Sequence, residues 1–194
     1  NTLFSADSIA TLFGPDGFPR TFTPFRKRVE AALRPPPPTP APGHLPPPPA
    51  VPFHAVPRPR GRPHVALPLR GGREAGRRRL RQFIHDERGI DDYRQTRDCL
   101  DPLSGSSTLS PWLASGALSA REVAHAIARH EAEHGSNEST HWLYLELLWR
   151  EYFHWRALRE GRALFRAGGG GGALRNCTFE PRNFARWCSG DTDF

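Results

Sequence analysis

The chain has 194 residues, a formal net charge of +7 and a pI near 10.3, and Lys27 is its only lysine. Its three cysteines, Cys99, Cys177 and Cys188, are odd in number and share no metal-ligand spacing, which argues against a disulfide framework or a metal site. The sequence contains no secretory leader pattern and no apolar run of membrane-spanning length. We therefore expect an intracellular protein with no membrane partner and no bound metal.

The positive charge is almost all arginine, which favours a polyanionic partner. The guanidinium group is planar and binds phosphate through two parallel hydrogen bonds. A coding bias that replaces lysine by arginine throughout would give the same composition, so charge alone does not decide between the two explanations. The absence of methionine leads us to expect an internal piece of a longer chain, whose compartment (chloroplast, mitochondrion or nucleus) the sequence does not distinguish.

Residues 1–33 are expected to be the end of an upstream unit and its connection. Thr23 and Pro24 open a short amphipathic helix with Phe25 and Val29 on one side. Because periodic apolar patterns are sparse before Gly71, we expect the packed core to begin there.

Residues 34–70 form a proline-rich segment with four-proline runs at 35–38 and 46–49. Such a segment favours polyproline II and cannot close a core, so we expect a disordered linker. A docking site for an SH3-like or WW-like protein partner is the open alternative, and the chain itself is expected to be a monomer. The glycine run 168–172 is expected to be a second flexible insertion.

Helices dominate residues 71–194. The stretch 71–85 places Leu80, Phe83 and Ile84 on one stripe with arginines opposite. A second helix should begin with Ser110 as a side-chain cap and Pro111 in the first turn, and end at Gly116.

Two longer helices follow. Ser119 and Glu122 have capping-box spacing, which predicts a helix to about His134, stopped by Gly135. The next helix should run over 137–160, and its segment HWLYLELLWREYFHW is apolar almost all round, as in a helix at the centre of a bundle.

Polar residues interrupt that central helix. Trp142, Glu146, Trp149, Arg150 and Phe153 share one helical stripe. A buried carboxylate needs a partner, and Arg150, one turn after Glu146, could supply it within the core. Alternatively, the stripe lines a cavity in which the indoles stack on flat rings and the carboxylate bonds to a base edge.

A cluster of hydroxyl groups precedes the Pro111 helix, in the stretch GSSTLSPWLASGALS, and follows DDYRQTRD by about ten residues. Small hydroxyl residues at a helix start can bind an anion such as a diphosphate, whereas a capped turn with spare polar residues is the simpler interpretation.

Four motifs in this order, YRQTRD, GSSTLSPWLASGALS, WLYLELLWREYF and FARWCSGDTDF, resemble the photolyase and cryptochrome flavoprotein family, most closely its DASH cryptochromes. TLFSADSIATLFG followed by FTPFRKRVE is similar to that family's connection between antenna and flavin domains. The resemblance implies a mainly α fold, a helical bundle that is the N-terminal part of the FAD-binding domain, interrupted by the proline-rich insertion.

The resemblance also implies roles for individual residues. The family motifs assign FAD contacts to Tyr93, to the hydroxyl loop and to Trp142, catalytic contacts with a damaged pyrimidine pair to Glu146 and Trp149, and DNA contacts to Arg97 and Arg150. The FAD contacts within the hydroxyl loop are Ser106, Ser107, Thr108, Leu109 and Ser110. The family's G-x-T-G-x-P motif is altered, since aspartate at 193 replaces the usual glycine.

The implied activity is that of a deoxyribodipyrimidine photo-lyase. Reduced FAD, with methenyltetrahydrofolate as an antenna, would repair cyclobutane pyrimidine dimers in DNA, most readily in single strands, under blue light. Two alternatives remain open: a cryptochrome with signalling output, and an arginine-rich nucleic-acid-binding module without flavin.

Overall fold

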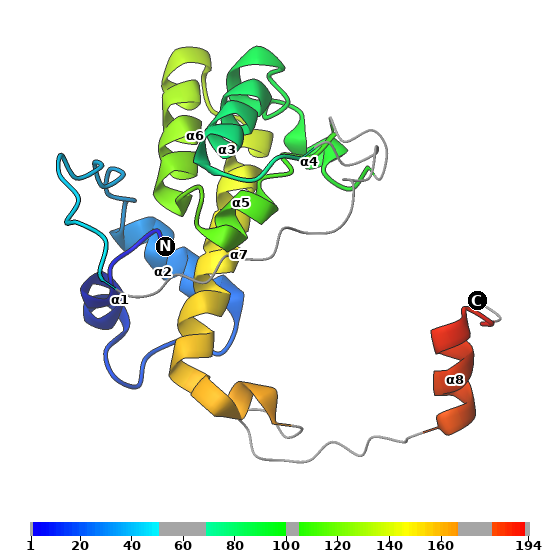
Figure 1. The fold of residues 1–194 in the computed structure, drawn as a ribbon. Coiled ribbons are helices and arrows are strands. Elements are labelled where there is room, and N and C mark those ends of the chain that lie inside the picture. The colour runs from blue at the N-terminus through cyan, green and yellow to red at the C-terminus, as the bar shows by residue number, and fades with distance from the viewer. Residues whose placement is uncertain (1, 51–68, 100–104, 167–179, 193–194) are drawn as a thin grey trace. The chain divides into compact units, whose positions relative to one another are not determined.

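The computed structural model describes residues 2–50, 69–99, 105–166 and 180–192, and every element in these ranges is helical. The described chain forms two compact units, Asn1–Tyr152 and Phe153–Phe194 (Figure 1). This confirms the mainly α fold. The predicted boundaries at residues 33 and 70 stay a prediction, and the glycine run 168–172 lies outside the described residues.

The N-terminal segment belongs to the core of the first unit, so the expectation that packing begins at Gly71 was wrong. Helices α1 (Ala6–Phe13) and α2 (Phe22–Ala32) bury five apolar side chains, and the segment before them buries two more. Phe22 and Phe25 of α2, and Phe18 in the loop before it, lie against Tyr152 of α7 (Glu138–Glu160), with ring centroids 5.4–6.0 Å away. The core signal was missed because these aromatic side chains come from two short helices and a loop, which show no long period. The buried residues are Leu3, Phe4, Ile9, Phe13, Phe22, Phe25 and Val29.

Glu151 of α7 ties the N-terminal segment to this helix. The side chain is fully buried, and its carboxylate accepts backbone N–H bonds from Leu3 at 2.9 Å and Phe4 at 3.2 Å. Arg121 of α6 (Ala120–His134) completes the contact by donating to the carbonyl of Leu3 at 3.0 Å. A buried carboxylate is tolerable here because backbone donors satisfy it.

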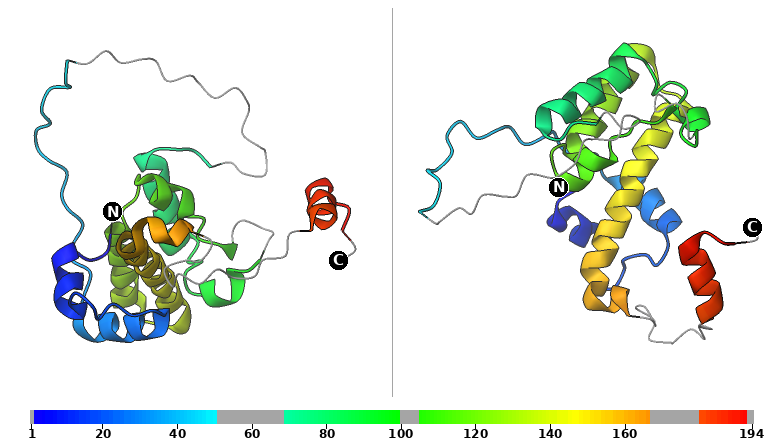
Figure 2. Two further views of the ribbon diagram at one scale, coloured as in Figure 1. Left: turned by 90° about the horizontal axis from the view of Figure 1, so that it is seen from below. Right: turned by 45° about the vertical axis from the view of Figure 1, so that its right-hand side comes forward.

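The predicted helix over 71–85 is present but divided into α3 (Arg73–Arg81) and a π-helical turn, η1 (Gln82–Asp86). Leu80, Phe83 and Ile84 are buried as predicted. Because α3 lies beside α6 (Figures 1 and 2), the side chains of Arg73 and Arg77 can both reach Glu122 of α6.

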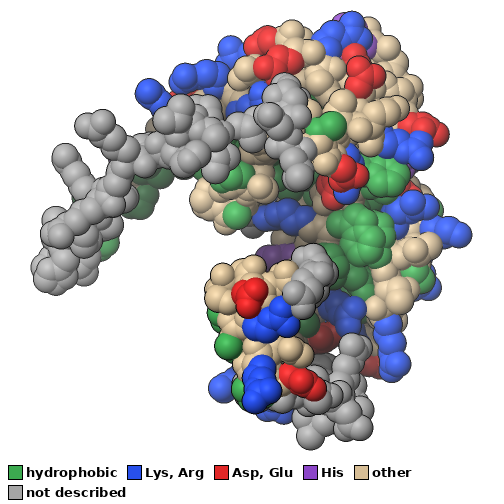
Figure 3. All heavy atoms as spheres, turned by 90° about the vertical axis from the view of Figure 1, so that its right-hand side faces the viewer, with side chains coloured by type: hydrophobic (Ala, Val, Ile, Leu, Met, Phe, Trp, Pro, Cys, Tyr) green, Lys and Arg blue, Asp and Glu red, His purple; other side chains and the backbone are tan. Residues whose placement is uncertain are grey.

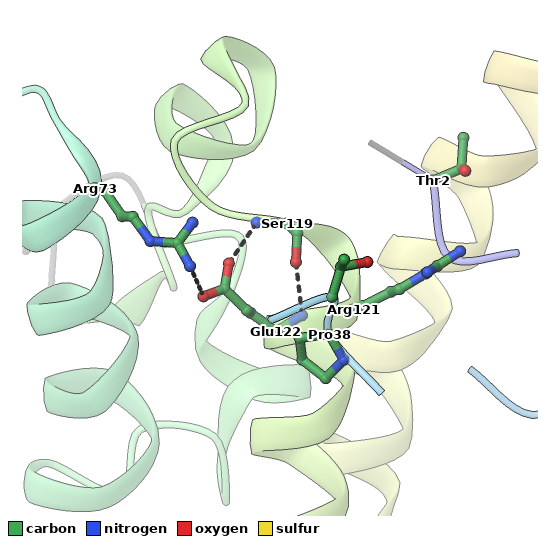
Figure 4. A pocket seen from close by; sticks show the side chains of 7 residues that line it. Thr2, Pro38, Arg73, Ser119, Arg121 and Glu122 are labelled. Atoms are coloured by element: carbon green, nitrogen blue, oxygen red, sulfur yellow. Dashed lines mark hydrogen bonds and ion pairs between the residues drawn. The ribbon is translucent and has the colours of Figure 1, made fainter. Parts of the chain in front are cut away.

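Helix α6 confirms the predicted capping box. The Ser119 hydroxyl accepts from the backbone N–H of Glu122, and the Glu122 carboxylate accepts from the backbone N–H of Ser119, both at 3.0 Å. Figure 4 shows this arrangement beside a pocket of about 270 Å³. The helix ends at His134, before Gly135 at φ 87°, as predicted.

Helix α4 (Tyr93–Thr96) is held between α6 and the start of α7. His130 of α6 is fully buried, and its Nε2 lies 2.6 Å from the carboxylate of Asp91, just before α4. On the other side, the backbone N–H of Arg94 donates to the Ser139 hydroxyl at 3.1 Å. These bonds fix the position of Tyr93, which is 7% exposed.

The second unit contains the end of α7, the 3₁₀ turn η3 (Gly161–Phe165) and α8 (Pro181–Ser189). Helix α8 follows from its sequence, with proline in the first turn and Gly190 in the left-handed region at φ 76° after its last residue. Its Phe184 and Trp187 are exposed and stacked on each other at 6.0 Å. No helix in the described residues is long and apolar enough to cross a membrane.

Candidate functional site

A cavity of about 410 Å³ in the first unit brings together most of the predicted site residues. Tyr93 of α4, Glu146 and Arg150 of α7 and the hydroxyl loop 106–110 line it. The loop and the α7 residues are about forty positions apart in sequence, so only the tertiary fold places them around one space. Apolar side chains complete the wall, namely Leu113, Ala114, Val123, Leu143 and Leu147.

The hydroxyl loop is held in a conformation that its side chains do not favour. Thr108 has φ 53°, in the left-handed region, which a β-branched residue rarely adopts. Arg79 of α3 spans the loop: its guanidinium donates to the carbonyls of Ser106 and Ser107, and to the Thr108 hydroxyl, at 2.9–3.1 Å. Ser107 is 8% exposed, so this part of the wall is shielded from water.

Tyr93 reaches the same wall. Burial raises the pKa of its hydroxyl, against the opposing effects of the Arg97 charge and a hydrogen bond with Ser107. The phenol is therefore neutral at physiological pH and can donate a hydrogen bond.

The Pro111 helix differs from its prediction at the start. Helix α5 (Ser110–Ser115) begins at Ser110 itself; Leu109 precedes it, and no side chain caps the helix. The prediction of Ser110 as a cap was wrong because Ser110 is the first residue of the helix, beside Pro111, and the cap position before it is occupied by Leu109. Its end is as predicted, since Gly116 has φ 76°. A six-residue helix has a weak dipole, so the case for a ligand depends on the cavity and not on this helix terminus.

Glu146 has a different partner from the one that helical spacing offered. Its carboxylate forms an ion pair with Arg97 and accepts from the Trp142 indole N–H at 3.2 Å. Arg150 donates to the carbonyl of Leu113 on α5, at 3.4 Å. The pairing with Arg97 crosses from α7 to the residue that follows α4, which local spacing could not predict.

The two predicted tryptophans do not line the cavity. Trp142 lies under the guanidinium groups of Arg94 and Arg97, which are 5.3 and 5.6 Å from its ring centroid. Trp149 stacks on Phe22 of α2 with a centroid distance of 3.6 Å, and 39% of its surface is exposed. The expectation that this helix is buried nearly all round was therefore wrong at Trp149 and at Phe153, which is 56% exposed.

Several residues of the site escaped the sequence analysis. Leu143 and Leu147 line the cavity and lie three residues before and one residue after Glu146. Helical spacing alone could therefore have identified Leu143 as a cavity residue.

Arg79 was assigned from the sequence to the polar face of its helix. It lies one turn before Phe83 at the edge of the apolar stripe, and its guanidinium is 5.4 Å from that ring. An arginine at such an edge is a detectable signal for a buried contact.

Across the described ranges, no group of three or more histidine, cysteine or carboxylate side chains is arranged to hold a metal ion. Cys99 and Cys188 are exposed free thiols, and Cys177 lies outside those ranges.

Known proteins resemble this chain over its whole length. It is 36% identical over 194 residues to a cryptochrome DASH of Idiomarina loihiensis, covering all of this chain and 42% of that protein. A cryptochrome DASH of Gloeobacter violaceus is 35% identical over 193 residues, covering 94% of this chain and 38% of the relative. A relative from Solanum lycopersicum, named cryptochrome DASH, chloroplastic/mitochondrial, is 29% identical over 206 residues. That match covers 100% of this chain and 34% of the relative. No protein-family model matches the chain.

A solved structure shows the same fold. The crystal structure of a cryptochrome from Synechocystis sp. superposes with a TM-score of 0.81 at 33% identity, over all of this chain and 41% of the other. Fold and sequence together relate the chain to the cryptochromes. It is a homologue of the DASH cryptochromes, and it spans about two fifths of the length of the first two relatives.

Proposed function

We propose that this chain is part of a flavoprotein that absorbs blue light and repairs cyclobutane pyrimidine dimers in DNA, most readily in single strands. The observation that carries the proposal is the cavity in which Tyr93, the hydroxyl loop and Glu146 meet. The similarity to DASH cryptochromes supports it. Because those relatives are longer than this chain, the proposal concerns only the part of the site that this chain supplies.

The cavity fits the polar part of FAD. Its volume of about 410 Å³ is in the range of small-molecule sites, roughly 300–1,000 Å³. The hydroxyl groups of the loop and a neutral phenol provide donors for phosphate and ribityl oxygens. The leucines among the lining residues suit a flat ring. We assign Tyr93 and residues 106–110 to FAD, with Trp142 beside it. Methenyltetrahydrofolate as an antenna is proposed from the family resemblance alone.

FAD supplies a photoexcited electron donor when bound and reduced. The residues of this chain would hold the lesion in reach and stabilise the charge that develops on it. Glu146 hydrogen-bonds to the pyrimidine pair in exchange for its ion pair with Arg97, whose guanidinium turns to the DNA backbone. Trp149, fixed on one side by Phe22 and 39% exposed, packs on the pyrimidine rings.

DNA reaches this site through arginine contacts. Arg97 and Arg150 are the assigned phosphate-binding residues, and the net charge of +7 adds a general attraction to DNA. Figure 3 shows lysine and arginine side chains dispersed over one face with carboxylates among them, so no single-sign surface covers that face. Extrusion of the lesion costs only a few kcal/mol, and least in single strands or at a damaged base.

The test begins with the absorbance spectrum of the protein expressed from its complete reading frame. A flavin spectrum is expected, and its absence from protein refolded with FAD would contradict the proposal. The flavoprotein is then reduced and illuminated with single-stranded oligonucleotides that contain one dimer. Restored absorbance of the separate pyrimidines indicates repair, whereas bound flavin with no repair would indicate signalling output.

A further inference from the structure

Arg79 connects α3 to the hydroxyl loop through one guanidinium group. Nη2 donates to the Ser106 carbonyl at 2.9 Å, and Nε lies 3.1 Å from the Ser107 carbonyl and 3.0 Å from the Thr108 hydroxyl. Nη1 donates to Glu87 at 3.1 Å. Three consecutive loop residues are thus bonded to a single side chain that comes from a different helix.

The loop requires an external support of this kind. Thr108 is in the left-handed region at φ 53°, a strained conformation for a non-glycine residue that persists only when its surroundings impose it. The bonds within the loop are short-range: the Thr108 hydroxyl donates to the Ser107 carbonyl at 2.8 Å, and the Thr108 N–H points to the Ser106 hydroxyl at 3.4 Å. Such contacts do not anchor the loop to the helices.

Arg79 is itself held rigidly. Its side chain is 13% exposed, lies over the Phe83 ring at 5.4 Å, and pairs with Glu87. Glu87 is fixed in turn by the Gln82 amide, which donates to it at 2.7 Å. A planar, oriented guanidinium can meet three acceptors at once, which a lysine ammonium on a flexible stem cannot do from the same place.

We propose that Arg79 is a positioning residue for the cavity: it holds the hydroxyl loop in the conformation in which Ser106, Ser107 and Thr108 bind the phosphate groups of the ligand. The identity of that ligand as FAD rests on the proposed function, whereas the control of the loop by Arg79 does not.

The test compares Arg79→Gln and Arg79→Lys with Arg78→Gln, in the protein expressed from its complete reading frame. Arg78 is the matched control because it neighbours Arg79 on α3 and is exposed. Two quantities are measured for each variant: the dissociation constants for FAD and riboflavin, and the hydrogen-exchange rates of the amides of residues 106–109. Thermal unfolding shows whether each variant is folded.

The proposal expects both Arg79 variants to bind FAD about tenfold or more weakly, since loosening of a positioning contact commonly has effects of this size. Riboflavin, which lacks phosphate, should lose less affinity than FAD. Amides 107–109 should exchange faster in both Arg79 variants and at the wild-type rate in Arg78→Gln. A merely structural role would weaken both ligands equally.

Failure of this inference is distinguishable from failure of the proposed function. If the wild type binds neither flavin, the FAD assignment is overturned, and the exchange rates still decide the role of Arg79. If the wild type binds FAD and the Arg79 variants match Arg78→Gln in affinity and exchange, the positioning role is overturned alone. If Arg79→Gln does not fold, Arg79→Lys, which keeps the charge, provides the same comparison.

Discussion

Two glutamates on α7, five residues apart, have opposite environments. Glu151 is fully buried and bonded to the backbone of Leu3 and Phe4, whereas Glu146 is 37% exposed, lines the cavity and pairs with the Arg97 side chain. Five helical steps rotate a side chain by about 140°, so the two carboxylates point to different sides of the helix. One side of α7 holds the N-terminal segment in place, and the other side borders the ligand cavity.

The difference shows that burial and partner type separate a structural acid from a candidate catalytic acid. Backbone N–H donors cannot move away from Glu151 without unfolding the N-terminal segment. The Arg97 side chain can rotate, so the Glu146 carboxylate can exchange this partner for a substrate. Substitutions at the two positions should therefore affect different measurements.

Replacement of the buried acid should have the largest effect on stability. Glu151→Gln places an NH₂ group against one of the two backbone donors and leaves that buried N–H group without an acceptor, so we expect a loss of about 2–4 kcal/mol in the free energy of unfolding. Urea denaturation measures it, with Glu133→Gln on the exposed face of α6 as the control. A loss equal to that of the control would mean that Glu151 does not anchor the segment.

Replacement of the cavity acid should act on repair and leave stability nearly unchanged. We expect Glu146→Gln to slow dimer repair about tenfold or more, because it weakens the hydrogen bond by which the carboxyl group orients the pyrimidine pair. Its stability should fall by less than about 1 kcal/mol, since the ion pair with Arg97 is partly exposed.

The control for this variant is Glu138→Gln on the same helix. This substitution removes a carboxylate that pairs with Arg94. Single-turnover repair under saturating light is the measurement. Equal repair rates in Glu146→Gln and Glu138→Gln would remove the catalytic role from Glu146.

Two serines extend the comparison to helix starts. Ser119 caps α6, whereas Ser110 forms no capping bond at the start of α5. Ser119→Ala should cost about 1 kcal/mol of stability, as expected for loss of a cap. Ser110→Ala should cost less than about 0.5 kcal/mol. Thermal unfolding of both variants tests this order, and a larger loss for Ser110→Ala would contradict it.

The smallest expected effect is a pH dependence at Glu122. Burial would raise the pKa of this carboxyl, but hydrogen bonds from the Ser119 backbone and Arg77, and the charges of Arg73 and Arg77, lower it below its ordinary value of 4.5. Its stabilising contribution is therefore complete above pH 4.5 and is lost as the pH falls through the lower, folded-state pKa.

We expect that contribution to be about 0.5 kcal/mol, because the arginine partners are half-exposed. Unfolding free energies of wild type and Glu122→Gln should differ at pH 6 and converge at lower pH. A constant difference across this range would show that the charge of Glu122 does not stabilise the fold.

Much of the local structure could be predicted from the sequence. The capping box at Ser119, the stop at Gly135 and the turn at Gly116 depend on residues within a few positions of one another, and all three are confirmed. The motif resemblance also identified the cryptochrome family. Ser110 failed as a cap because the tertiary placement of the loop set the helix start, which propensity alone did not indicate.

Several residues that line the cavity could be named from the sequence, and their arrangement could not; their roles stay a prediction. Tyr93, residues 106–110, Glu146 and Arg150 do line one cavity, whereas Trp142 and Trp149 lie outside its wall. Helical spacing predicts which side chains share a face of α7. It does not predict which other element covers that face.

The sequence by itself determined the longer helices, the cap at Ser119 and the resemblance to the DASH cryptochromes, because hydrogen bonds between near neighbours and apolar periodicity are local properties. Only the tertiary structure decided that Glu146 pairs with Arg97, that Glu151 holds the backbone of residues 3 and 4, and that Arg79 braces the loop at Thr108. Each of these contacts joins residues 29 to 148 positions apart, and their partners are chosen by how the helices pack.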